Sequence, residues 1–454
     1  MIKNYLILIC MTAIGLSSCK NEPKTMLDPG NPFFSKYTTP FEAPPFDKIT
    51  NAHYVPAFEQ GMLEQKKEVE AIVNSHKKPT FENTLRALDR SGELLDKVSS
   101  VFGGLSAANT NDELQKIQLD MSPKLAAHKD EINLNPKLFE RVKAIYENRA
   151  NLNLTEEENY ILENEYKGFI RNGANLPPEK KEILKQMNQE LSVLAVKFGQ
   201  NVLAETNSFR MVVDKLSDLK GLPQSSIDAA AEAAKAAGLE RGNHGDDKDN
   251  KQILAKMMSI RAKKAQLLGY PTHTDMVMES RMAKNATNVM ELLDKVWAPA
   301  LKAAINDRDQ IQQMVKRQGG KFMFESSDWW MYTELPSQIM EHWATEPEVL
   351  KTYALHYQTG EPIPDQLIEK MEKSSIFNQG FTSVEFLSAC YLDMAYHMQK
   401  DTVPVDIARF EKDLLTKIGL IPEIEPRYHS WYFTHITGGY DAGYHTAHAQ
   451  PRLP

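Results

Sequence analysis

Helical periodicity extends along almost the whole sequence and constrains the fold more than any other feature. The clearest example follows Pro177-Pro178, where apolar residues recur at intervals of three and four, the spacing of one face of an α-helix. The apolar residues of this seam are Leu184, Met187, Leu191, Leu194, Phe198 and Val202. Such a seam is typical of long helices that pack against each other, so we interpret it as core packing rather than as a cofactor site.

The same spacing predicts further helices, whereas strands are scarce. The best candidate for the period-two alternation of a strand is the segment 211–216 (MVVDKL). Thr155 and Glu158 form a capping box ahead of an apolar stripe, which predicts the start of a helix. Helices are also expected at 50–75, 223–240, 251–268, 287–316, 337–358, 364–373 and 383–399. The sequence therefore predicts a mainly α fold.

The start of the chain has the pattern of an export signal. Lys3 precedes an apolar run at 5–16, which is too short to span a bilayer, because spanning takes about 20 residues. The sequence LSSC at 16–19 resembles a bacterial lipobox, in which Cys19 becomes lipidated. The alternative is an ordinary signal peptide with an incidental cysteine. The pattern predicts an exported lipoprotein, anchored to a membrane through Cys19, in the periplasm or at the outer membrane.

Charge and cysteine content exclude several classes of function. The formal net charge is -8 and no basic patch is interleaved with aromatic residues, so nucleic acid is not expected as a partner. Of the three cysteines, Cys10 would leave with the signal and Cys19 would carry lipid, so no internal disulfide is expected. Cys390 lies in an apolar helical run and is expected to be a packed core thiol rather than a nucleophile.

Seven stretches carry a resemblance when they are taken together and in order. They are 31–59, 79–89 (PTFENTLRALD), 169–177 (FIRNGANLP), 241–270, 334–350 (ELPSQIMEHWATEPEVL), 374–381 (SSIFNQGF) and 435–444 (HITGGYDAGY). This set resembles the M3 family of zinc peptidases, the oligopeptidase and peptidyl-dipeptidase group, and is most similar to its dipeptidyl carboxypeptidase branch. The resemblance implies a large, elongated helical shell in which a channel admits unfolded oligopeptides.

The resemblance also implies a zinc site and a group of hydrogen-bond donors. In the family, an H-E-x-x-H helix supplies two zinc ligands and the general base, and a glutamate on the next helix is the third ligand. By its E-x-P-S-Q context, Glu334 matches that third ligand. The alternative for Glu334 is a helix-start carboxylate favoured by the helix dipole. His435, Tyr440 and Tyr444 match the family's donors to the developing oxyanion.

The centre of that zinc site is missing from the sequence. None of the twelve histidines is followed by glutamate, so the chain contains no H-E-x-x-H motif. The segment 328–330 (DWW) runs directly into MYTELPSQ, where the family has a long block. We therefore expect the zinc-binding helix to be absent rather than mutated. A second internal gap is expected between Glu240 and Arg241.

The end of the chain departs from the family as well. After Tyr444 the family continues with further tyrosines, whereas this chain continues with HTAHAQPRLP. His445 and His448 have i, i+3 spacing but lie in a tail with a weak helical pattern, so no substitute metal site is expected there. A closed zinc site is worth about 10–16 kcal/mol of apparent binding free energy and needs all its ligands. Zinc is thus implied by the family but is not expected to be held by this chain.

These observations leave three interpretations of the function open. The first is a metallopeptidase lineage that hydrolyses short peptides in the manner of a peptidyl-dipeptidase, with this chain itself inactive. The others are a non-catalytic peptide-binding or scaffold lipoprotein, and a truncated gene product without function. Oligopeptides and, through the lipid, a membrane are the expected partners. The expected segments are a signal at 1–19, a linker at 20–45, a helical domain at 46–240 and the remnant of the catalytic domain at 241–454.

Overall fold

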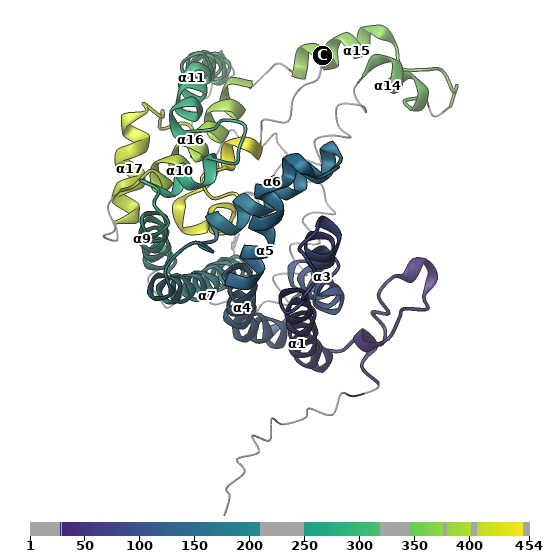
Figure 1. The fold of residues 1–454 in the computed structure, drawn as a ribbon. Helices are drawn as coiled ribbons and strands as arrows, with labels where there is room; N and C mark the ends of the chain where they lie inside the picture. Colours follow the sequence, from purple (N-terminus) through teal and green to yellow (C-terminus); the bar gives the residue numbers. More distant parts are fainter. Residues whose placement is uncertain are drawn as a thin grey trace, which may run out of the picture. The chain divides into compact units, whose positions relative to one another are not determined.

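The computed structural model confirms a mainly α fold (Figure 1). It describes residues 28, 30–208, 249–317, 346–356, 358–375, 379–400 and 406–447. Within these residues there is no strand, and the one β-type pairing recorded there is an isolated bridge between Leu355 and Pro362. In the same residues, no helix combines the length and the apolar composition needed to cross a bilayer. The predicted strand at 211–216 and the predicted helix at 223–240 lie outside the described residues.

The chain divides into two compact units, of which the first comprises Met1–Lys67 and Gly92–Thr110. Its elements are η1 (Pro32–Phe34), η2 (Pro40–Glu42), η3 (Asn51–His53), the first part of α1 (Tyr54–Val73) and α3 (Glu93–Ala108). The ring of Phe102 meets the rings of Tyr54 and Phe58 edge-on, at centroid distances of 5.0 and 5.4 Å. Phe33, in the segment predicted as a linker, is buried beside Tyr54.

The second unit comprises Glu68–Ser91 and Asn111–Pro454. Its helices are η4 (Phe81–Arg86), α2 (Ala87–Asp89), α4 (Asp112–Asn133), α5 (Pro136–Glu147), η5 (Arg149–Asn151), α6 (Glu156–Arg171), α7 (Pro178–Ser208), α9 (Lys251–Leu267), α10 (His273–Met278), α11 (Ala286–Arg317), α14 (Pro347–Tyr353), α15 (Asp365–Ser375), α16 (Gln379–His397), α17 (Ile407–Lys417), η8 (Ser430–Tyr432), η9 (Thr434–Thr437) and η10 (Tyr444–Ala447). The start of α6 confirms the predicted capping box, because the Thr155 side chain accepts from Glu158 N and the Glu158 side chain accepts from Thr155 N.

The apolar seam predicted after Pro177-Pro178 lies on α7 and is core packing, as expected. Leu184 and Phe198 are fully buried, and α7 packs against α4 and α9. The predicted domain boundary at residue 240 stays a prediction, because it lies outside the described residues. What the structure shows is that the helices on either side of it, α7 and α9, pack against each other.

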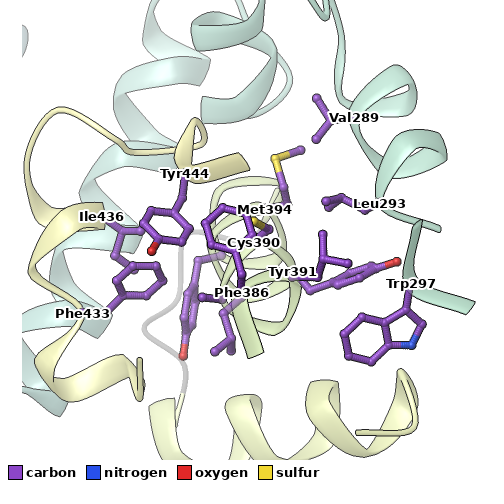
Figure 2. Close-up of a cluster of buried hydrophobic side chains, with 14 of the residues drawn as sticks. Val289, Leu293, Trp297, Phe386, Cys390, Tyr391, Met394, Phe433, Ile436 and Tyr444 are labelled. Carbon is purple, nitrogen blue, oxygen red and sulfur yellow. The ribbon is translucent and has the colours of Figure 1, made fainter. Parts of the chain in front are cut away.

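Helix α16 lies at the centre of the larger core (Figure 2). Its side chains lie between Leu293 and Trp297 of α11 on one side and Phe433 and Tyr444 of the C-terminal segment on the other. Burial on both faces explains why the sequence of α16 is apolar almost all round. Cys390 of this helix is fully buried, and burial raises the pKa of its thiol, which confirms the prediction of a core thiol.

The predicted helix at 337–358 is wrong at its C-terminal end. Helix α14 ends at Tyr353, and the chain then folds back, with Ile363 N donating to Ala354 O (2.9 Å). Gly360, at φ 72°, allows the left-handed turn that this reversal needs. Tertiary turn chemistry therefore overrides the helical spacing of the apolar residues. The part of the prediction at 337–345 lies outside the described residues.

Candidate functional site

The three residues predicted as hydrogen-bond donors lie together in the C-terminal segment. The ring centroids of His435 and Tyr444 are 5.5 Å apart, those of His435 and Tyr440 are 6.0 Å apart, and those of the two tyrosines are 6.4 Å apart. We call this group the His/Tyr cluster. Its chemical role stays a prediction. Glu334 and Cys19, the predicted zinc ligand and lipidation site, lie outside the described residues.

Two short 3-10 helices and the turn between them form the His/Tyr cluster. His435 lies in η9 and Tyr444 begins η10. Between them, Tyr440 N donates to His435 O (3.3 Å) and Gly443 N donates to Tyr440 O (2.9 Å). Ala442 has a φ of 55°, in the left-handed region that residues with a Cβ seldom adopt. The turn therefore depends on partners outside itself.

The members of the His/Tyr cluster differ in exposure and in proton chemistry. Tyr440 is 45% exposed, whereas Tyr444 is 4% exposed. Burial, followed by the interaction with Tyr428, raises the pKa of the Tyr444 phenol well above its ordinary value. Burial and the charge of Arg427 lower the pKa of His435, so its imidazole is neutral at neutral pH. The cluster thus offers neutral hydrogen-bond donors, and only Tyr440 among its tyrosines is freely reached by solvent.

Sequence reasoning missed Tyr428, which lies against the His/Tyr cluster. Its ring is 4.8 Å from that of His435 and 5.9 Å from that of Tyr444, and it stacks on Phe433 at 4.8 Å. The neighbouring Arg427 is paired with the buried Glu385, with Nη1 3.5 Å from Oε2. The signal that could have identified Tyr428 is the aromatic-rich run at 428–433, directly before the stretch at 435–444.

A buried polar network, also missed from the sequence, lies beneath the His/Tyr cluster. It centres on Arg261 of α9, whose Nη1 donates to Nε2 of His397 (2.7 Å) and to Ile436 O (2.5 Å). Nδ1 of His397 lies 2.8 Å from Oδ1 of Asp393, one helical turn earlier on α16. Because a guanidinium only donates, Nε2 of His397 must accept, which assigns the imidazole proton to Nδ1.

A second carboxylate completes the network from the C-terminal segment. Oδ2 of Asp441 lies 2.6 Å from Nε2 of His273 and 3.8 Å from Nη2 of Arg261. Burial alone would raise the pKa of Asp441, but the Arg261 charge and the hydrogen bond from His273 outweigh it and hold that pKa well below its ordinary value. Burial lowers the pKa of His273 to about 3, so its neutral imidazole donates to the carboxylate. We call Arg261, His273, Asp393, His397 and Asp441 the Arg261 network.

The Arg261 network does not fit a zinc ion. Its cationic centre is the guanidinium, and the oxygens of Asp393 already accept backbone N–H groups of Ala442 and Tyr444 (2.8 and 2.9 Å). Zinc ligands need free lone pairs that converge on one point. Within the part of the chain that the structure describes, no group of three or more His, Cys, Asp or Glu side chains has a metal-binding arrangement.

A third histidine–carboxylate contact, outside the Arg261 network, holds the start of η8. Nδ1 of His429 lies 2.5 Å from Oε1 of the buried Glu411, and Ser430 N donates to Oε2 of the same carboxylate (2.7 Å). Burial alone would lower the pKa of His429, but the hydrogen bond and the charge of Glu411, with a smaller contribution from Glu425, raise it. The pKa of His429 is therefore raised, whereas the pKa of His273 is lowered.

Opposite effects of pH on stability are expected for these two histidines. Below about pH 6.5 the unfolded chain protonates His273 while the folded chain does not, so the unfolding free energy falls by up to about 1.4 kcal/mol per pH unit. For His429, stabilisation is complete below about pH 6.5 and is lost as the pH rises through its raised pKa. Urea unfolding of His273→Gln should show a smaller acid-side loss, and His429→Gln a smaller alkaline-side loss. Unchanged slopes would contradict these assignments.

The sequence of the chain is similar to those of known peptidases. The model of peptidase family M3 matches residues 224–334 and 323–447. The chain is 27% identical to a dipeptidyl carboxypeptidase of Salmonella typhimurium over 609 aligned positions, covering 91% of this chain and 90% of the relative. It is 28% identical to the Escherichia coli dipeptidyl carboxypeptidase over the same length, covering 91% and 89%. Oligopeptidase A of Escherichia coli is 22% identical over 352 positions, covering 69% and 52%.

The form of these matches bears on the expected internal gaps. An alignment of 609 positions is longer than the 454 residues of this chain, so parts of the relative must lie opposite gaps in it. The two matches to the family model meet at 323–334, around the junction at Trp330 and Met331 where the sequence predicts a missing block. The two dipeptidyl carboxypeptidases each match 91% of this chain. The chain belongs to peptidase family M3.

Proposed function

We propose that this chain binds short peptides at the His/Tyr cluster and does not hydrolyse them as written. Peptidases of family M3 depend on zinc, and two relatives that match 91% of this chain are dipeptidyl carboxypeptidases, whose name states that they remove dipeptides from a carboxyl end. A peptide with a free carboxyl end is therefore the ligand class that we propose for this chain.

The observation that carries the proposal is the clustering of His435, Tyr440 and Tyr444, whose ring centroids lie 5.5 to 6.4 Å apart, with Tyr440 exposed at its edge. A peptide backbone offers carbonyl oxygens, which need N–H or O–H donors. Tyr440 is 45% exposed, and Nδ1 of His435 is a buried atom that has no hydrogen-bond partner among the described residues. Neutral donors suit a neutral carbonyl, because they leave no uncompensated charge when the peptide excludes water.

The lack of hydrolysis in this proposal rests on the sequence. Water attack on a peptide bond in this family needs zinc to polarise the water and a glutamate to take its proton. No histidine in the chain is followed by glutamate, so the motif that supplies two ligands and the base is missing. The donors of the His/Tyr cluster can polarise a carbonyl, but none of them is a base strong enough to activate water alone.

A second candidate function is hydrolysis itself. It is favoured by the near-complete coverage of two dipeptidyl carboxypeptidases. It would require a metal held by a different set of ligands, among which Glu334 is the family-matching residue.

We also propose that the chain carries an export signal and a lipid anchor at Cys19, which the LSSC sequence supports. Fractionation of cells that express the chain tests them, and a wholly unattached protein would contradict the anchor.

The test combines binding, cleavage and metal analysis on the purified chain. A fluorescent, amino-blocked peptide with a free carboxyl end is expected to bind, and it should stay intact with or without added zinc. Tyr440→Phe removes one exposed hydroxyl and should weaken binding by about fivefold, since a hydrogen bond is worth about 1 kcal/mol. Tyr160→Phe is the matched control, because Tyr160 is 69% exposed on α6 and lies outside the cluster.

Each outcome decides one part of the proposal. Chelator-sensitive cleavage together with stoichiometric zinc would overturn the claim that the chain does not hydrolyse peptides. No measurable peptide binding would overturn the claim that it binds them. Equal affinities of Tyr440→Phe and Tyr160→Phe would place binding away from the His/Tyr cluster.

A further inference from the structure

The turn that carries Tyr440 and Tyr444 is held by a buried carboxylate from another helix. Asp393 of α16 is fully buried, and its Oδ1 accepts from Ala442 N at 2.8 Å. Its Oδ2 accepts from Tyr444 N at 2.9 Å. Backbone N–H groups that converge in this way form a concave anion site, and here the anion is a side chain of the same protein.

The turn needs this partner because its own backbone is strained. Ala442 lies at φ 55°, where the Cβ comes too close to the backbone in any residue other than glycine. A charge-assisted hydrogen bond to Asp393 is stronger than the water contact that would replace it. Without the carboxylate, the left-handed conformation of Ala442 would lose its main support, and Tyr444 would move with it.

The side chain of Asp441 holds the same turn through a second set of contacts. Asp441 extends from the turn to His273 of α10 (2.6 Å) and towards Arg261 of α9. The carboxylate of Asp393 is held by a hydrogen bond from Nδ1 of His397, and Nε2 of the same imidazole accepts a hydrogen bond from Arg261. Two carboxylates therefore anchor three of the five residues from Tyr440 to Tyr444, and both depend on Arg261.

We propose that Asp393 is a positioning residue that sets where the hydroxyls of Tyr440 and Tyr444 stand relative to His435, with Asp441 as the second anchor. The inference rests on the proposed function, since the His/Tyr cluster is taken as the peptide-binding surface. Asp393 itself touches no ligand, because it lies beneath the turn with no exposed surface. It acts on peptide affinity through the backbone of Ala442 and Tyr444.

The first test is peptide affinity in a double-mutant cycle. Asp393→Asn keeps one acceptor but places an N–H₂ group against an N–H donor, and it should weaken binding of the amino-blocked peptide about tenfold. In a Tyr440→Phe/Tyr444→Phe background, the same change should have little further effect. A purely structural role would instead give the same fold-change in both backgrounds. The matched control is Asp130→Asn, a buried carboxylate on α4 that bonds Asn188.

The second test does not require peptide binding. Tetranitromethane should nitrate the exposed Tyr440 but spare the buried Tyr444 in the parent chain, as read by mass mapping. Asp393→Asn should make Tyr444 reactive, whereas Asp130→Asn should not. Asp441→Asn serves if Asp393→Asn fails to fold, because asparagine still accepts from His273.

The outcomes separate this inference from the proposed function. If the parent chain binds no peptide but Tyr444 becomes reactive in Asp393→Asn, the proposed function fails and the anchoring of the turn stands. If Tyr444 stays protected in folded Asp393→Asn and in Asp441→Asn, the positioning role is overturned. Additive fold-changes in the cycle, or equal affinities of the parent and Asp393→Asn, overturn it as well.

Discussion

Replacing Arg261 by methionine is expected to lower the free energy of unfolding by about 3–5 kcal/mol. Arg261 is buried, with 6% of its surface exposed, and its guanidinium lies among His397, Ile436 O and Asp441. Methionine fills a similar volume but leaves an acceptor nitrogen and a carbonyl oxygen without donors and the Asp441 charge without its cation. The cost of breaking such a buried group is large because water cannot replace the lost partner.

Urea unfolding followed by tryptophan fluorescence measures this effect, and Arg308→Met is the matched control. Arg308 of α11 makes ion pairs with Asp309 (2.8 Å) and Glu423 (3.3 Å), but its side chain is 26% exposed. Its removal should cost about 1 kcal/mol or less, because water and salt screen exposed pairs. Asp441→Asn added to Arg261→Met should recover part of the loss, since one of the two buried carboxylate charges that face Arg261 is then removed. Equal losses of unfolding free energy for the two variants would show that the Arg261 network stabilises the fold no more than a surface ion pair does.

Replacing Leu293 by alanine is expected to lower the unfolding free energy by about 2–5 kcal/mol. Leu293 of α11 is 2% exposed and faces the buried side of α16, beside Val289 and Trp297 (Figure 2). Truncation removes apolar contacts and leaves a cavity in the largest core of the second unit. Two long helices meet at this point, so the gap cannot close by the movement of a single side chain.

The chain offers a stringent control for this prediction in the next residue. Leu292 lies on the same helix and has the same side chain, but it is 52% exposed. Leu292→Ala should change the unfolding free energy by no more than about 0.5 kcal/mol, because exposed side chains contribute little packing. Both variants have the same helix propensity change, so the difference between them isolates burial. Comparable losses for the two variants would contradict the placement of α11 against α16.

Most helices could be predicted from the sequence because their signals are local. The capping box at Thr155 and the seam from Leu184 to Val202 depend on residues three and four apart, and both are found in the structure. The end of α14 could not be predicted in this way. The chain reverses direction at Gly360 instead of continuing the helix. This reversal is stabilised by the pairing of Leu355 with Pro362, and the spacing of apolar residues along the sequence does not reveal such a pairing.

In the candidate site, too, residues that are close together in the sequence could be predicted, whereas residues that meet only in the folded structure could not. His435, Tyr440 and Tyr444 could be selected because they fall within one short stretch that resembles a family motif. Tyr428 and the Arg261 network could not, because a lone arginine on one helix and an aspartate on another have no spacing that links them. Their role depends on proximity in space and on burial, which raises the strength of each polar contact.

The sequence by itself determined the helical class, the core role of Cys390 and the family, because periodicity, apolar runs and motif order are properties of the chain taken in order. Only the tertiary structure decided that Asp393 and Asp441 both anchor one turn and that Arg261 contacts both His397 and Asp441. The physical reason is that a buried charge is tolerated only beside partners, and those partners come from α9, α10, α16 and the C-terminal segment, which meet only when the chain is folded.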